Sequence, residues 1–259
     1  AAFRKAFGKP VMLARVATSA DDAKVGSKIE LFVSHGFRPD QMDQIESLID
    51  VADGFVIRAG LGTDLPKLAA ELDAWSARTG KMLDLHLRIA ANNPAANIKD
   101  DGAILAAAAE LHACALAFPR IGMFLDPFMD LDRGYFVRNG LVDRRCNLRT
   151  SGLAVEALAA FLPADCGPYA TTVTETAEGR ILEVSGSKGM GLLLLPKPGA
   201  TLAVPAAAIK DAAAKGPLQV VPLDAPWTVS PEIGTRATPV APPSDVTRPT
   251  LIVGPSFQT

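Results

Sequence analysis

The sequence predicts an α/β fold: a TIM-barrel-like parallel sheet of about four βα units, then an antiparallel β domain and a proline-rich tail. Strand-like segments are followed by helix-like segments four times between residues 28 and 161. That order favours parallel strands joined by right-handed crossovers. The strand starts lie roughly 25 to 40 residues apart, which suits the repeating unit of a barrel or of a doubly wound sheet. A closed barrel needs eight units, so we expect a partial barrel.

Each expected element is identified by hydrophobic periodicity and by residues that begin or end helices. In the clearest unit, Thr63 or Asp64 caps a helix that carries Pro66 in its first turn and ends before Gly80. The expected strands cover residues 11–16, 28–34, 53–59, 82–89 and 120–126, and the expected helices cover residues 39–49, 65–78, 100–116 and 151–161.

After Pro163 the chain changes character and becomes rich in Thr, Val, Leu and Ile. Such residues favour strands, and Glu178-Gly179 and Gly186-Ser187 are turn signals between them. We therefore expect hairpins over residues 171–184 and 191–204, extended by residues 218–221 and 227–229. The final segment carries six prolines, which favours an extended tail. The expected domains are residues 1–165 for the barrel-like domain, 166–229 for the β domain and 230–259 for the tail.

Composition excludes several classes of partner. Hydrophobic residues make up 49% of the 259 residues, charged residues make up 21%, and the formal net charge is -2. This balance does not favour binding to nucleic acid or to an anionic membrane surface. No run of eighteen apolar residues occurs, so we expect a soluble protein without a membrane span. The first ten residues lack an initiating Met and a signal-peptide core, which indicates a processed or truncated start; the compartment stays open.

The three cysteines do not indicate a metal or redox site, because Cys114, Cys146 and Cys166 lie far apart in the sequence. Cys114 lies in an alanine-rich helix, where a buried thiol is the simplest interpretation. A disulfide between Cys146 and Cys166 is the minor alternative. We expect no cofactor.

The segment from Met82 to Ile89 alternates apolar and ionisable residues with the period of a β-strand. Its leucines share one face, and Asp84, His86 and Arg88 share the other. An amphipathic edge strand with its charged side in water would show the same pattern. This segment, however, lies between two helix-like segments, where both faces of a strand are normally covered. We therefore expect the three ionisable side chains to line a cavity.

Functional groups of parallel barrels gather at the carboxyl ends of the strands. Arginine presents a planar fork to carboxylate, sulfonate or phosphate groups, so two arginines near this end favour an anionic sugar or sugar acid. A neutral imidazole near an aspartate can act as a general base. The catalytic candidates are His86, Asp84 and Asp126, and the substrate-binding candidates are Arg15, His35, Arg58, Arg88 and Asp130.

Structural roles compete with these assignments. His35 can cap the following helix, and Arg58 can form a structural ion pair. His112 lies within a helix and is interpreted as a packed residue. The charged residues from 130 to 145 fit a solvated loop with internal ion pairs. A metal site formed by His86, Asp84 and Glu30 is a further alternative, although their spacing is not diagnostic.

Two passages resemble the closing part of (β/α)8 glycoside hydrolase barrels. Asn139 to Arg149 reads Asn-Gly-Leu-Val-Asp-Arg-Arg-Cys-Asn-Leu-Arg, which resembles the passage "GLVDxxxNPRPA" after the eighth strand of those barrels. Thr79 to Leu87 similarly resembles "TGKPxWxTE", which ends the seventh strand with the catalytic nucleophile Glu. Here Leu87 occupies the nucleophile position, and the Asn-Glu pair that carries the acid/base of those families is absent.

This resemblance implies the carboxyl-terminal half of a glycoside hydrolase-like barrel with a trailing β domain, which acts on or binds an anionic carbohydrate. The missing Glu favours a second hypothesis, a non-catalytic subunit that retains the scaffold. A third is a barrel of the sugar isomerase, epimerase or aldolase type. Bare edges of a half-barrel invite pairing, so we expect a homo-oligomer or a second chain that completes the sheet.

Overall fold

A computed structural model describes residues 12–13, 36–50, 52–89, 100–132, 136–187, 189–213, 218–226 and 243–254. The chain forms two compact units, and each is described by itself. The first unit contains residues 1–100 and 118–147, and the second contains residues 101–117 and 148–259.

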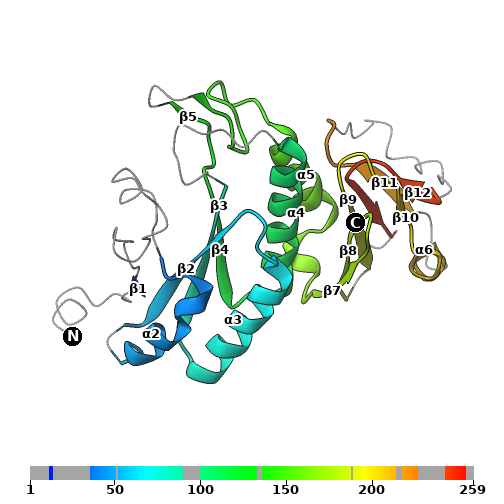
Figure 1. Cartoon of the computed structure of the whole chain (residues 1–259). Helices are drawn as coiled ribbons and strands as arrows, with labels where there is room; N and C mark the ends of the chain where they lie inside the picture. The colour runs from blue at the N-terminus through cyan, green and yellow to red at the C-terminus, as the bar shows by residue number, and fades with distance from the viewer. Residues whose placement is uncertain are drawn as a thin grey trace. The chain divides into compact units, whose positions relative to one another are not determined.

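The first unit is built on a parallel four-stranded sheet (Figure 1). Its strands follow the chain in the order β1-β2-β3-β4, and every pair is parallel. Their bounds are β1 Met12–Leu13, β2 Gly54–Gly60, β3 Met82–Arg88 and β4 Ile121–Asp126. The predicted parallel sheet is thus confirmed, and the described strands form a sheet of four rather than a closed barrel. The strand expected at 28–34 lies outside the described residues.

Helix α3, Leu65–Thr79, links β2 to β3 and begins and ends as its sequence predicts. The Asp64 side chain accepts a hydrogen bond from the Lys67 backbone N–H, and Gly80 takes the left-handed conformation, with φ of 67°, that ends the helix. The helix expected at 39–49 is shorter. A 3-10 turn, Pro39–Gln41, precedes α2, Met42–Ser47.

The hydrophobic core of this unit lies against one face of the sheet. Leu83, Leu85 and Leu87 are buried, while Asp84, His86 and Arg88 between them are half-buried, as the alternating sequence predicts. Helix α3 contacts β3 and β4, and its Trp75 packs edge-on against Phe55 of β2, with ring centroids 6.1 Å apart. Burying one leucine side chain contributes about 1.5–3 kcal/mol to the free energy of folding. The buried leucines therefore fix which face of β3 carries the polar residues.

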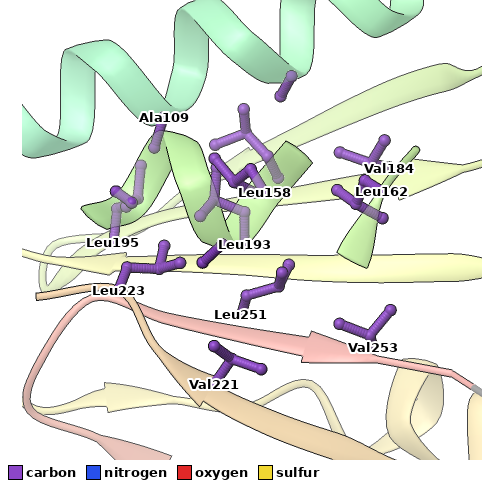
Figure 2. Packing of buried hydrophobic residues seen from close by; sticks show 14 of the residues in the cluster. Ala109, Leu158, Leu162, Val184, Leu193, Leu195, Val221, Leu223, Leu251 and Val253 are labelled. Atoms are coloured by element: carbon purple, nitrogen blue, oxygen red, sulfur yellow. The ribbon is translucent and has the colours of Figure 1, made fainter. Parts of the chain in front are cut away.

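The second unit packs two helices on an antiparallel sheet. The helices are α4, Asp101–Ala117, and α5, Thr150–Phe161. The strand order is β11-β13-β9-β8-β7, with bounds β7 Ala170–Glu175, β8 Gly179–Ser185, β9 Met190–Pro196, β11 Gln219–Pro222 and β13 Thr250–Val253. Figure 2 shows the core on one side of this sheet, where Leu158 of α5 and Leu162, which follows the helix, lie among strand residues such as Leu193 and Leu251. The hairpin predicted over residues 171–184 is confirmed by the β7–β8 pair, and the turn signal Gly186-Ser187 is confirmed by the β8–β9 pair. The hairpin predicted over residues 191–204 is wrong, because residues 202–203 pair with residues 245–246 instead.

The second unit also has a smaller apolar cluster, which includes Leu192 and Ile252 of the sheet. It is joined by Leu202 of β10 and Val246 of β12, which pair with each other. The elements involved are β10 Leu202–Ala203, β12 Asp245–Val246 and α6 Ala206–Ala213.

The end of the chain differs from the expected tail. Thr250–Val253 forms β13, which lies between β9 and β11 with all four residues buried. Its β-branched and apolar side chains fill the sheet, and Pro249 stands just before the strand, where its missing N–H breaks no ladder bond. The prolines of this part of the sequence therefore do not keep Thr250–Val253 out of the sheet.

Helix α4 clusters with the second unit, as α5 does. It carries buried residues around most of its circumference and contacts α5, β7 and β8. Alanines on both helices, such as Ala109 and Ala157, allow this close packing. The cysteines are free thiols, so Cys146 and Cys166 form no disulfide. In the described part of the chain, no helix has the length and hydrophobicity to cross a membrane.

Candidate functional site

The polar face of the parallel sheet is formed by residues in matched register on β2, β3 and β4. Arg58, His86 and Phe124 occupy one row across the three strands, and Arg88 and Asp126 share the next row. All five lie on the face opposite the buried leucines, because side chains alternate along a strand. The sheet thus brings together four of the predicted site residues and adds a phenylalanine.

Two arginines converge on this face. Arg88 Nη1 lies 3.5 Å from Asp126 Oδ2, and the Arg88 side chain is 24% exposed. Burial lowers the pKa of Arg88, the Asp126 carboxylate opposes this, and the charge of Arg58 lowers the pKa further. Arginine nevertheless stays protonated near neutral pH. Arg58 and Arg88 thus lie in adjacent rows of the polar face, on neighbouring strands.

Asp84 lies one row earlier on β3, opposite Gly122 of β4. A Cβ at residue 122 would overlap Asp84 Oδ1 and lie 3.2 Å from the Phe124 ring. The absence of a side chain there lets both groups extend over β4. The rings of His86 and Phe124 have centroids 4.9 Å apart. Burial raises the pKa of Asp84, and the charge of His86 opposes this. Gly122 therefore makes room for a packed group of one carboxyl and two rings.

The loop after β4 is fastened to the carboxyl end of β3. Asn139 is 1% exposed, and its Nδ2 donates to the carbonyl of Ile89 at 3.0 Å. Asp130 is 9% exposed, and its Oδ1 accepts from the Gly140 N–H at 3.1 Å. Buried hydrogen bonds of this kind fix the path of a loop. Asp130 thus helps to hold this loop in place, and its predicted contact with a ligand stays a prediction.

The passage that carries the resemblance forms a turn. Asp143 Oδ1 accepts hydrogen bonds from the backbone N–H groups of Arg145, at 2.8 Å, and Asn147, at 2.9 Å. Cys146 between them has a φ of 63°. Such side chain to backbone bonds are typical of tight turns. These contacts explain the Asp and Asn of the passage without a ligand.

Other predicted residues lie elsewhere. Arg15, His35 and Glu30 fall outside the described residues. His112 is half-buried on α4, and burial lowers its pKa, as expected for a packed helix residue. Among the described residues, no group of three or more His, Cys, Asp or Glu side chains is arranged to hold a metal ion.

The sequence analysis missed Phe124 and Asn139. Phe124 lies two residues before Asp126 on β4 and therefore shares its face. This spacing was the available signal, but phenylalanine in a parallel strand usually belongs to the core. It is instead 50% exposed. Asn139 gave no local signal, because its partner Ile89 is fifty residues away in sequence.

The chain was compared with known proteins. No protein-family model matches it, and no curated protein matches it. Two solved structures are similar in part. A glucosidase from Croceicoccus marinus has a TM-score of 0.35 and 15% identity, over 66% of this chain and 38% of the glucosidase. A GH30 endoxylanase from Clostridium papyrosolvens C71 has a TM-score of 0.42 and 14% identity, over 80% of this chain and 50% of the endoxylanase. The chain thus spans half or less of these glycoside hydrolases, and the proposals below depend on its own geometry.

Proposed function

We propose that this chain binds an anionic carbohydrate on the polar face of β2, β3 and β4. The observation that carries the proposal is the register that places Arg58, His86 and Phe124 in one row, with Arg88 in the next. The guanidinium forks suit the carboxylate of a sugar acid. The half-exposed Phe124 offers an apolar surface to the C–H groups of a sugar ring. Asp84 and His86 on the same face supply groups that form hydrogen bonds with hydroxyls.

Binding fits this face better than hydrolysis by two carboxylates. Asp84 pairs in register with Gly122, four residues before Asp126 on β4. Four strand residues span about 13 Å. Retaining glycosidases hold two carboxyl groups about 5 Å apart, and inverting enzymes hold them about 6.5–9.5 Å apart. Asp126 also lies beside Arg88, which holds its carboxylate in an ion pair.

The test is the affinity for oligosaccharides of glucuronic or galacturonic acid, measured by titration calorimetry against neutral glucose oligomers of equal length. We expect measurable binding of the acidic oligomers and weaker binding of the neutral ones. Arg58→Gln and Arg88→Gln should each lower the affinity about tenfold or more, because a hydrogen bond to a charged group contributes about 1.5–3 kcal/mol.

The matched control is Arg78→Gln. Arg78 lies on α3 and bridges Glu46 at 3.0 Å, away from the polar face. The Arg78→Gln variant loses the same positive charge as the other two variants. It therefore separates recognition by Arg58 or Arg88 from the effect of net charge. Equal losses in all three variants, or equal affinity for acidic and neutral oligomers, would contradict the proposal.

A catalytic role is the second candidate, with His86 as general base and without Asp84 and Asp126 acting together as a carboxylate pair. It is favoured by the contact between His86 and Phe124, which orients the imidazole. Release of reducing ends from the acidic oligomers, lost in His86→Gln while binding persists, would establish this role. Turnover unchanged by His86→Gln would exclude it.

A further inference from the structure

The balance of charge on the polar face is the feature from which we draw a further inference. Three successive rows of residues share this face of β2, β3 and β4. Their charged or titratable side chains are Asp84 in the first row, Arg58 and His86 in the second, and Arg88 and Asp126 in the third. The two arginines and the two aspartates cancel in formal charge. With a neutral imidazole, the described part of this face therefore carries no net charge.

The neighbouring elements do not change this balance. The 3-10 turn before α2 contacts β2. There the Arg38 side chain, which donates to Asp40 at 2.9 Å, lowers the pKa of Asp40, and the charge of Arg58 adds to this. Arg38 and Asp40 are one positive and one negative charge, so together they add none. Helix α3 also contacts β3, but on the opposite face, where the leucines are buried.

His86 is the side chain that can change the sign of this balance near neutral pH. Histidine is the residue type that gains or loses a proton between pH 5 and pH 8. Arginine stays charged over this range, and aspartate in general loses its proton at a lower pH. A proton on the imidazole gives three positive charges against two negative ones. The protonation state of His86 therefore decides whether the face attracts an anion.

The position of His86 places this charge where the ligand is proposed to bind. In register, His86 stands between Arg58 of β2 and Phe124 of β4. Its ring is half-buried, with its centroid 4.9 Å from that of the exposed Phe124 ring. A protonated imidazole donates from both nitrogens, and a hydrogen bond from a charged donor to a carboxylate is stronger than one from a neutral donor. The proton thus adds a charged donor beside the ring on which the sugar would lie.

Asp84 changes its charge in the same direction. Burial raises the pKa of Asp84, and the charge of His86 opposes this. Because its pKa is raised, Asp84 takes up a proton at a higher pH than an exposed aspartate does. A falling pH therefore adds a positive charge at His86 and then removes a negative charge at Asp84. Both changes favour the binding of an anion.

We propose that the polar face binds its acidic carbohydrate together with a proton, which His86 carries. The inference rests on the proposed function and adds regulation by pH, with tighter binding at pH 5.5 than at pH 7.5. Binding and protonation are reciprocal, so a ligand that prefers the protonated site must raise the number of protons that the site holds. A neutral oligosaccharide carries no charge for the imidazolium to attract.

The first measurement compares the affinity for galacturonic acid oligomers at pH 7.5 and pH 5.5 by titration calorimetry at one ionic strength. The carboxyl groups of the oligomers are ionised at both pH values. We expect binding to be about fivefold tighter at pH 5.5, because a charged donor makes a hydrogen bond roughly twice as strong as a neutral one. Neutral glucose oligomers should show no such change. Equal affinity at both pH values would overturn this inference and leave the proposed function standing, whereas no binding at either pH would contradict both.

The second measurement counts the protons that the protein takes up on binding at pH 6.5, from the binding enthalpy in two buffers of different ionisation enthalpy. It uses the unchanged chain, so it does not depend on the folding of a variant. We expect net uptake, and we expect His86→Gln to abolish it whatever the affinity of that variant. His112→Gln is the matched control and should keep the uptake, because it removes the histidine of α4 in the second unit. No uptake by the unchanged chain, or uptake that persists in His86→Gln, would overturn the inference.

Discussion

Two arginine–carboxylate pairs of this chain differ in what surrounds them. In the second unit, Arg180 of β8 lies 3.1 Å from Glu110 of α4, and the side chains are 22% and 6% exposed. In the first unit, Arg88 of β3 lies 3.5 Å from Asp126 of β4, and the Asp126 side chain is 53% exposed. The first pair joins a helix to a sheet, whereas the second joins two strands that already share a ladder.

This difference indicates what each arginine does. Arg180 is held by the buried Glu110 and also lies 3.1 Å from Glu175, although its Nε–H does not point at that carboxylate. Its role is to neutralise a buried charge. The partner of Arg88 is largely in water, where an ion pair contributes little to stability. The proposed ligand therefore competes with Asp126 for Arg88 rather than with a buried partner.

The largest expected effect comes from breaking the buried pair. Glu110→Ala leaves Arg180 without its main partner beneath α4, and removing one member of a buried pair costs about 3–5 kcal/mol. We expect that loss in the free energy of unfolding, measured by urea denaturation at pH 7. Glu175→Ala is the control, because Glu175 is 65% exposed and should change the free energy by less than about 1 kcal/mol. Similar losses in both variants would show that burial does not distinguish them.

A smaller effect is expected within the polar face. Gly122→Ala places a methyl group where Asp84 Oδ1 lies, and overpacking of this kind costs about 1–3 kcal/mol. Asp84→Ala should relieve the overlap, so the double variant should be more stable than Gly122→Ala alone. Gly60→Ala is the control, since its Cβ would meet no atom within 4 Å. Additive effects of the two substitutions in a double-mutant cycle would contradict the packing of Asp84 over Gly122.

The first unit could largely be predicted from the sequence because its signals are local. The alternation of Leu85 and its neighbours identified β3 and its buried face, and Asp64 and Gly80 marked the ends of α3. Parallel order then followed from the succession of strands and helices. The polar row could be predicted only in part, because register decides which residues of different strands become neighbours. Phe124 was missed because a phenylalanine in a parallel strand usually belongs to the core.

The second unit shows where sequence reasoning failed. Nothing near Thr250–Val253 indicates that this segment enters a sheet between strands that lie some thirty and sixty residues earlier in the chain. Such long-range pairing leaves no local trace, and the surrounding prolines suggested a tail. Glu110 on α4 likewise gives no local signal of its partner. Its partner Arg180 lies seventy residues away, and only the folded chain brings them together.

The smallest expected change in stability comes from Asp126→Asn. This variant also tests whether Asp126 competes with the ligand for Arg88 or contacts the sugar itself. Asp126→Asn removes an exposed partner of Arg88, so the free energy of unfolding should change by less than about 1 kcal/mol. If Asp126 competes with the ligand for Arg88, the variant should bind acidic oligosaccharides more tightly, by about fivefold at most, because that is the factor to which 1 kcal/mol corresponds. Glu46→Gln, which frees Arg78 on α3 instead, should leave the affinity unchanged. Weaker binding in Asp126→Asn would mean that this carboxylate contacts the sugar itself, and Arg88 would then be held in place by Asp126 rather than released to the ligand.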